Sequence, residues 1–124
     1  MATLNKVYLI GNVGRDPDVR SVNNGKVASF SLATATRYKD RNGESKEDTE
    51  WHNIVVFGNS AEYVEKYVSK GTQLHVEGRI RYRKYEKDGE ARYVTEILAN
   101  SLQNLSPKRG EQNEPDEGGL DIHF

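Results

Sequence analysis

The sequence predicts a small all-β domain with one short helix. Runs rich in β-branched and aromatic residues recur along the first hundred residues, and Gly, Pro, Asn or Asp separates most of them. One segment between these runs instead has apolar residues at helical spacing. At 124 residues, the chain has the length of a single domain with a core large enough to fold unaided.

Five segments are predicted to be strands because they combine β-branched and aromatic residues or alternate apolar with polar ones. They are residues 7–10, 27–36, 51–57, 74–85 and 93–102. Residues 40–48 are predicted to form a longer polar loop between the second and third strands. Lys87-Asp88-Gly89-Glu90 is typical of a hairpin turn between the last two.

One helix is predicted over residues 59–69. Ala61, Val64, Tyr67 and Val68 fall on one face at helical spacing. Asn59 followed by Glu62 resembles a capping box with Asn in place of Ser or Thr. Gly71, just beyond the last periodic residue, supplies the stop.

The order of elements is three strands, one helix and two strands. This order predicts a five-stranded Greek-key barrel of the OB type. We expect the barrel domain to occupy residues 1–106. The remaining residues, 107–124, are acidic and rich in turn-forming residues, and they predict a disordered tail.

The charge is divided unevenly along the chain. Residues 1–109 hold all 18 Lys and Arg against 14 acidic residues, a net charge of +4, whereas residues 110–124 hold five acids and no base. A mildly basic body suits a polyanionic partner. The tip of the tail consists of Asp121, Ile122, His123 and Phe124, and a hydrophobic residue that carries the terminal carboxylate indicates a peptide captured by another protein.

The sequence offers little for catalysis, and we expect a protein that is not an enzyme. It has no Cys, and its three His residues are scattered without metal-ligand spacing, so no metal and no cofactor are expected. No Ser-His-Asp arrangement, P-loop or HExxH motif is present. The N-terminus lacks the apolar run of a signal peptide, and no segment approaches membrane-spanning length, so a soluble intracellular protein is expected.

A cationic stripe occupies one face of the fourth predicted strand. Side chains alternate between the two faces of a strand, and the odd positions here are Arg79, Arg81, Arg83 and Tyr85. Arginines alone are equally compatible with a solvated outer surface. The aromatic residue in the stripe favours a surface that follows phosphates and stacks bases.

The third predicted strand is ambiguous because both of its faces are partly apolar. One face carries Trp51, Asn53, Val55 and Phe57, and the other carries His52, Ile54 and Val56. A single Trp in a small domain is more often a core residue than a platform for a ligand. The pattern alone therefore leaves open which face is the core.

Several separate motifs resemble those of the bacterial single-stranded DNA-binding protein family, in the same order. They are NKVYLIGNV at 5–13, GRDP at 14–17, TEWHNIVVFG at 49–58, KG at 70–71 and VEG at 76–78. The resemblance spans about residues 4–103, and the terminal DIHF resembles the acidic tip of that family. It implies an OB fold, usually a homotetramer, that binds single-stranded DNA without sequence preference.

The resemblance also implies roles for individual residues. It assigns base stacking to Tyr38, Trp51, Phe57 and Tyr85, and so it turns the Trp51 side of the third strand toward DNA. Tyr38 would not be selected from pattern alone, because its parity matches Phe30 and Leu32 and predicts an inward direction unless the strand bulges or ends. Lys6, Lys70, Arg81, Arg83 and Lys84 match basic positions near the nucleic acid, Arg79 joins them from the stripe, and His52 matches a position linked to subunit assembly.

We therefore expect a cytoplasmic, nucleoid-associated protein that coats and protects single-stranded DNA in replication, recombination and repair. Its tip would recruit replication and repair enzymes, although the linker is short and His123 replaces the usual Pro of the family. Two alternatives remain. One is an RNA-binding or replication-restart module, for which a dimer is one option, and the other is an oligosaccharide-binding or purely structural assembly domain. The three arginines of the stripe give no reason to select a neutral sugar.

Overall fold

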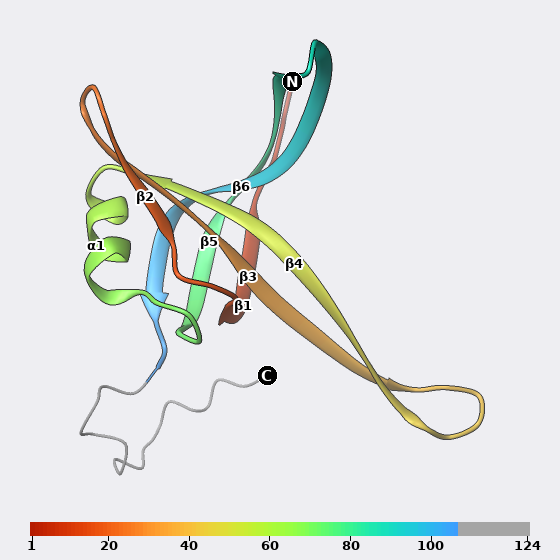
Figure 1. Cartoon of the computed structure of the whole chain (residues 1–124). Coiled ribbons are helices and arrows are strands. Elements are labelled where there is room, and N and C mark those ends of the chain that lie inside the picture. The colour runs from red at the N-terminus through yellow and green to blue at the C-terminus, as the bar shows by residue number, and fades with distance from the viewer. Residues whose placement is uncertain (107–124) are drawn as a thin grey trace.

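The structure is a computed structural model that describes residues 1–106 of the chain. Its elements are β1 (Val7–Val13), β2 (Asp18–Val22), β3 (Gly25–Lys39), β4 (Ser45–Phe57), α1 (Asn59–Tyr67), β5 (Gln73–Lys87) and β6 (Glu90–Asn104) (Figure 1). In this part of the chain no helix is long and apolar enough to cross a membrane. The predicted tail, 107–124, with Asp121, Ile122, His123 and Phe124, lies outside the described residues.

Five of the strands close into a barrel. Neighbours in the sheet follow the order β1-β5-β6-β4-β3, and β3 pairs again with β1. β4 and β6 run parallel, whereas the other barrel pairs are antiparallel. The helix lies in the chain between the third and fourth barrel strands, so the predicted five-stranded OB-type barrel is confirmed.

The core lies where the inward faces of the strands meet the helix. It includes Phe30 and Leu32 of β3, Ile54 and Val56 of β4, and Leu74 and Val76 of β5, with Ala61 and Val64 of α1 packed against them. Full burial of one such Leu, Ile or Phe side chain contributes about 1.5–3 kcal/mol. Apolar and polar residues alternate along β3 and β5 as predicted, and the buried face of each strand is the apolar one.

Two hairpins extend beyond this core, and their length differs from the prediction. Residues 45–48 belong to β4 rather than to a loop, and a short turn remains in which the Asp40 carboxylate accepts the N–H groups of Asn42 and Glu44. The extended parts are mostly polar, so they carry no hydrophobic pattern that predicts strands. Figure 1 shows the β3–β4 arm and the β5–β6 arm projecting from the barrel in different directions.

β2 is an additional strand that the sequence did not predict. It pairs only with the beginning of β3, from Asp18 opposite Ser29 to Val22 opposite Gly25, and so it lies outside the closed ring. Four of its five residues are exposed. Because almost nothing on β2 is buried, its sequence has no apolar alternation from which it could be recognised.

The start of the helix also differs from the prediction. The N-cap is Gly58, and no side chain caps the helix, so the predicted capping box of Asn59 and Glu62 is wrong. Gly58 has φ of +66°, which glycine adopts without strain, and this turn leads directly from β4 into α1. The helix ends at Tyr67, two residues earlier than predicted, because Val68 is extended and enters the core.

Barrel closure depends on a close approach at Gly11. A Cβ atom at this position would lie 2.2 Å from the carbonyl oxygen of Ala33 in β3. The adjoining pairs, Asn12 with Ala33 and Val13 with Leu32, join the two ends of the sheet. A side chain at residue 11 would therefore push β1 away from β3.

We predict that Gly11→Ala lowers the free energy of unfolding by about 1–3 kcal/mol, the usual cost of inserting a methyl group into packed structure. Urea denaturation measures this. The control is Ser21→Ala, an exposed site on β2, which should change stability by less than about 0.5 kcal/mol. A Gly11→Ala protein as stable as the wild type would show that barrel closure does not require the close approach.

Candidate nucleic-acid interface

The outer face of β4 carries two exposed aromatic side chains. Ile54 and Val56 are fully buried, whereas Trp51 and Phe57 are 61% and 49% exposed. The register explains this division, since β4 pairs with β3 so that Ile54 lies opposite Phe30 and Val56 opposite Ala28. The structure therefore resolves the ambiguity of this strand, and the Trp51 side faces outward.

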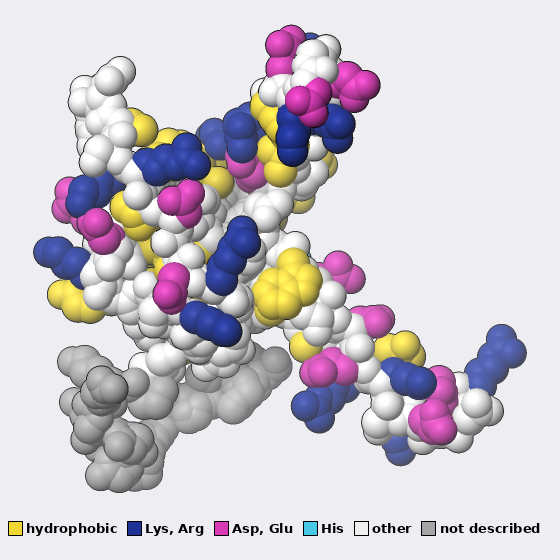
Figure 2. Space-filling view, viewed as in Figure 1, with side chains coloured by type: hydrophobic (Ala, Val, Ile, Leu, Met, Phe, Trp, Pro, Cys, Tyr) yellow, Lys and Arg dark blue, Asp and Glu magenta, His cyan; other side chains and the backbone are white. Residues whose placement is uncertain are grey.

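The cationic stripe of β5 lies on the same outer surface. β6 runs between β4 and β5, and its Leu98 pairs with Val55 on one side and with Arg79 on the other. Paired residues point to the same face, so Val55, Leu98 and Arg79 share it. Figure 2 shows Lys and Arg side chains interleaved with hydrophobic ones where the barrel meets the two arms.

Two open grooves meet at Phe57. The first, with a volume of about 680 Å³, is lined by Asn53, Phe57, Arg81 and Arg83 among others, and also by Arg15 and Arg20. The second groove is lined by Phe57 together with Lys6 and Arg79. The structure thus brings together five of the predicted binding residues: Lys6, Phe57, Arg79, Arg81 and Arg83. Arg15 and Arg20 were not predicted, because neither belongs to the stripe.

The ring of Trp51 rests on the backbone of Gly14. A Cβ atom at residue 14 would lie 2.3 Å from Cζ3 of the indole, so only glycine allows this contact. The Gly14 N–H donates to the carbonyl of Ser31 at 2.9 Å, which fixes the backbone under the ring. In the sequence, Gly14 begins the GRDP motif at 14–17, which does not reveal this contact. The contact supports one side of the indole, and Trp51 remains largely exposed.

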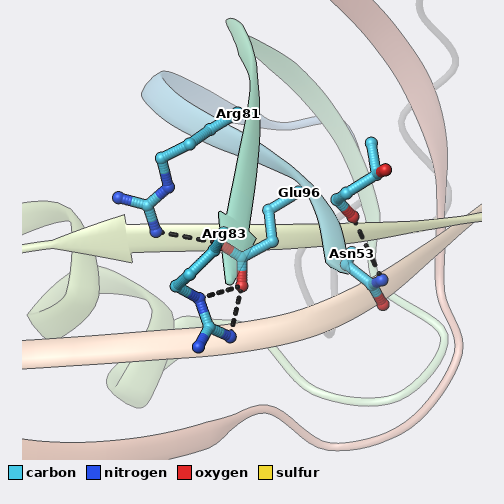
Figure 3. A network of polar contacts seen from close by, with 5 residues as sticks. Asn53, Arg81, Arg83 and Glu96 are labelled. Atoms are coloured by element: carbon cyan, nitrogen blue, oxygen red, sulfur yellow. Dashed lines mark hydrogen bonds and ion pairs between the residues drawn. The ribbon is translucent and has the colours of Figure 1, made fainter. Parts of the chain in front are cut away.

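Arg81 and Arg83 share one buried carboxylate (Figure 3). Nη2 of Arg81 donates to Oε1 of Glu96 at 2.8 Å, and Nε and Nη2 of Arg83 donate to Oε2 at 3.1 and 2.8 Å. Glu96 is 5% exposed and pairs directly with Arg81 across the β5–β6 ladder. Glu96 was not predicted, because only the strand register reveals that it lies between the two arginines.

This cluster shifts the pKa values of Glu96 and Arg83. The hydrogen bond from Arg83 is the main cause that holds the pKa of Glu96 below its usual range, and burial opposes it. The same bond raises the pKa of Arg83. A lowered folded-state pKa means that the cluster stabilises the fold above the ordinary glutamate pKa, and this contribution is lost as the pH falls through the lowered value. At neutral pH the cluster therefore holds two positive charges and one negative charge.

The three predicted lysines differ in their surroundings. Nζ of Lys6 forms an ion pair with Glu77 at 3.0 Å, and the hydrogen bond to Glu77 is the main cause that raises the pKa of Lys6. Lys70 lines neither groove, and its backbone N–H donates to Asp16 at 2.8 Å. Lys84 also lines neither groove, and strand alternation places it on the opposite face of β5 from Arg83.

Tyr38 and Tyr85 lie on different arms. β3 continues through Tyr38 in regular pairing with β4, so Tyr38 keeps the parity of Leu32, but the core has ended and the side chain is 46% exposed. Tyr38 therefore points to the side that parity predicts, but beyond the end of the core this side is open to solvent. Tyr85 ends the stripe, with the guanidinium of Arg83 6.0 Å from the centre of its ring.

His52 lies half-buried on the inward side of β4. Its Nε2 is 2.9 Å from the hydroxyl of Thr34, so within one chain the ring has a hydrogen-bond partner on β3. The assembly role expected for His52 remains a prediction. Within residues 1–106, no group of three or more His, Asp or Glu side chains is placed to hold a metal ion.

The chain matches known proteins over almost all of the described region. Residues 4–105 match the model of the single-strand binding protein family. A relative from Xylella fastidiosa (strain 9a5c), described as single-stranded DNA-binding protein 1, is 46% identical over 112 residues, which is 88% of this chain and 82% of the relative.

Two solved structures have the same fold. One, the Plasmodium falciparum SSB complex with ssDNA, has a TM-score of 0.77 and 38% identity, and the match covers 86% of this chain and 98% of that one. The other, a deletion mutant of the single-stranded DNA binding protein from Thermus aquaticus, has a TM-score of 0.72 and 33% identity, covering 83% of this chain and 51% of that one.

The matched family consists of DNA-binding proteins without enzymatic activity, in agreement with the expectation that this chain is not an enzyme. The family match and the identity to the relative cover the β4 motif, the stripe on β5 and the barrel that positions them. The chain therefore belongs to the single-strand binding protein family.

Proposed function

We propose that the protein binds single-stranded DNA without sequence preference, through the outer surface formed by β4, β6 and β5. The observation that carries this proposal is the position of Phe57, an exposed aromatic side chain that lines both grooves, with Arg81 and Arg83 in one and Arg79 in the other. Trp51 extends the same face along β4, and Tyr85 extends it along β5.

The mechanism combines stacking with neutralisation of phosphates. All four bases have a π-face, so stacking on Trp51 and Phe57 does not depend on sequence. Arg79, Arg81 and Arg83 neutralise phosphates and release counterions, which makes the affinity fall as salt is added. In this proposal the bound protein protects the strand without changing it, as a member of a family without enzymatic activity.

The similarity to named proteins supports the same function. The relative from Xylella fastidiosa is described as binding single-stranded DNA, and the Plasmodium falciparum protein was solved in a complex with it. The conformity of this chain to both, over most of its length, favours DNA over the oligosaccharide and purely structural alternatives.

We further propose that the protein acts in the cytoplasm at the nucleoid, in replication, recombination and repair. In this proposal four chains assemble, with His52 near a subunit contact. The barrel of residues 1–106 binds DNA, and residues 107–124 serve as a tail whose tip recruits replication and repair enzymes. The sequence of that tip supports the last step, since Ile122 and Phe124 are apolar residues that follow the acidic Asp121.

The DNA-binding proposal is tested by fluorescence titration. Trp51 is the only Trp of the chain, so its emission reports on one place in the proposed interface. We expect oligo-dT to quench this emission at lower concentrations than duplex DNA or oligo-U, and a neutral glycan to leave it unchanged. Unchanged emission with oligo-dT would place the DNA elsewhere, and tighter binding of oligo-U would favour the RNA-binding alternative.

The matched variants are Trp51→Ala and Tyr67→Ala. Trp51→Ala should weaken binding of a labelled oligo-dT by about 1–3 kcal/mol for the lost stacking on one base. Tyr67 is an equally exposed aromatic, 61% exposed, but it lies on α1 and not on β4, which carries Trp51. Fluorescence anisotropy measures both affinities. Equal losses in the two variants would mean that exposed aromatics contribute without regard to position.

The role of the tail is tested by deleting Asp121 to Phe124. Truncation should leave thermal stability and the sedimentation mass of four chains unchanged, because three large apolar residues in 110–124 are too few to form a core. DNA affinity should rise slightly at low salt, since an anionic competitor is removed, and added salt should screen the gain. Replication and repair enzymes should no longer be recovered from a host lysate.

A control protein carries the same four residues in reverse order, which preserves their composition and changes only their order. It should recover as few enzymes as the truncated protein. Identical sets of recovered enzymes with all three proteins would contradict a recruiting role of the tip. A sedimentation mass below four chains would contradict the proposed assembly.

A further inference from the structure

A buried carboxylate, Glu96, lines the first groove together with Arg81 and Arg83. Glu96 is 5% exposed, whereas the side chains of Arg81 and Arg83 are 33% and 50% exposed. Each carboxylate oxygen accepts from a different guanidinium, so both arginines are tied to one point of β6. Figure 3 shows both side chains directed toward Glu96.

The hydrogen bonds to Glu96 do not use all of the donors on the two guanidiniums. Arg81 uses Nη2 alone, and its Nε is buried without a partner among the described residues. Arg83 uses Nε and Nη2. The Nη1 group of each arginine donates to no carboxylate in this cluster, and both residues line the groove beside Phe57. The arrangement retains hydrogen-bonding capacity for an anion that enters the groove.

The carboxylate also limits the charge of the pair. Two guanidiniums and one ionised Glu96 carry a net charge of +1, and the lowered pKa of Glu96 keeps it ionised at neutral pH. In addition, the bonds to Glu96 restrict the rotamers of two long side chains before any ligand arrives. Ordering such a side chain on binding costs about 0.5–1.5 kcal/mol, and this cost is already met in the free protein.

We propose that Glu96 is a positioning residue that makes Arg81 and Arg83 one pre-ordered, singly charged receptor for a backbone phosphate. This inference rests on the proposed function, because it assigns the groove to the phosphates of single-stranded DNA. It has a quantitative consequence. The two arginines neutralise one phosphate together, although two independent arginines would neutralise two.

The salt dependence of binding distinguishes these cases. For single strands, the slope of log affinity against log salt changes by about 0.7 for each phosphate neutralised. The triple variant Arg81→Gln, Arg83→Gln and Glu96→Gln removes the whole receptor and leaves no unpaired buried charge, which protects the fold. We expect its slope to be shallower than that of the wild type by about 0.7, whereas independent arginines predict about 1.4.

The single variant Glu96→Gln tests the same claim, but here the salt slope is expected to become steeper instead of shallower. It raises the net charge of the cluster from +1 to +2, so the slope should become steeper by about 0.7. Affinity should rise at low salt and fall below that of the wild type at high salt, where lost ordering of the arginines outweighs the added charge. Loss of a merely structural contact would lower affinity at every salt concentration and leave the slope unchanged.

The control is Glu65→Gln, which also breaks an ion pair and raises the net charge by one. Glu65 lies on α1 and pairs with Lys26, and neither residue lines a groove. Its slope should equal that of the wild type, which excludes an effect of total charge. Circular dichroism and thermal melting confirm the fold of each variant. If Glu96→Gln does not fold, the triple variant decides alone.

The inference is overturned by a change of about 1.4 in the triple variant, by no change there, or by an unaltered slope in folded Glu96→Gln. These outcomes leave the proposed function intact as long as oligo-dT quenches Trp51 in the wild type. Absence of that quenching would instead contradict the proposed function, and the inference would fall with it.

Discussion

The pairing of β4 with β6 determines which side chains share the outer surface. It consists of two residue pairs, Ile54 with Ile97 and Val55 with Leu98, and it joins the β3–β4 hairpin to the β5–β6 hairpin. The two isoleucines are buried in the core, so their neighbours in the sequence must face outward. Asn53 reinforces the joint, since its Nδ2 donates to the carbonyl of Thr95 at 3.3 Å. Without this short parallel pairing, the aromatics of β4 and the arginines of β5 would belong to separate surfaces.

The two arms differ physically from the barrel that carries them. Beyond the core they are held by backbone ladders and exposed ion pairs such as Arg37 with Glu47 at 3.6 Å, and exposed pairs contribute little. Few buried contacts place these segments at the less stable end of the fold. Trp51 and Phe57 thus lie on the part of β4 that packs on the core, whereas Tyr38 and Tyr85 lie on the less stable extensions.

The sequence predicted those parts of the fold that bury apolar side chains. Alternation identified the core faces of β3 and β5, and helical spacing identified α1. β2 and the arm segments could not be predicted, because polar residues that gain only ladder hydrogen bonds have no hydrophobic period. Gly58 was missed as the helix cap because its role depends on backbone angles, which a search for capping side chains does not consider.

Those residues of the candidate site could be predicted whose pattern lies within a single strand. The stripe of β5 follows from alternation within one strand. The outward direction of Trp51 required the resemblance to a family, since both faces of β4 are apolar. Neither strand alternation nor the family resemblance predicted the roles of Glu96 and Gly14, because each contacts a residue of another strand. Glu96 meets the arginines through the register of β5 with β6, and Gly14 lies in the segment that passes under the ring of Trp51.

Photochemical crosslinking tests the central claim, that the outer surface of β4, β6 and β5 holds the DNA. Oligo-dT substituted with iododeoxyuridine reacts with aromatic side chains that stack on its bases, and mass spectrometry locates the crosslinked residues. The account predicts crosslinks at Trp51, Phe57 and Tyr85. Tyr82 and Tyr93 are 72% and 71% exposed and serve as internal controls, since strand alternation places them on the opposite face of the β5–β6 arm. Crosslinks at Tyr82 and Tyr93, with none at Trp51 or Phe57, would contradict the account.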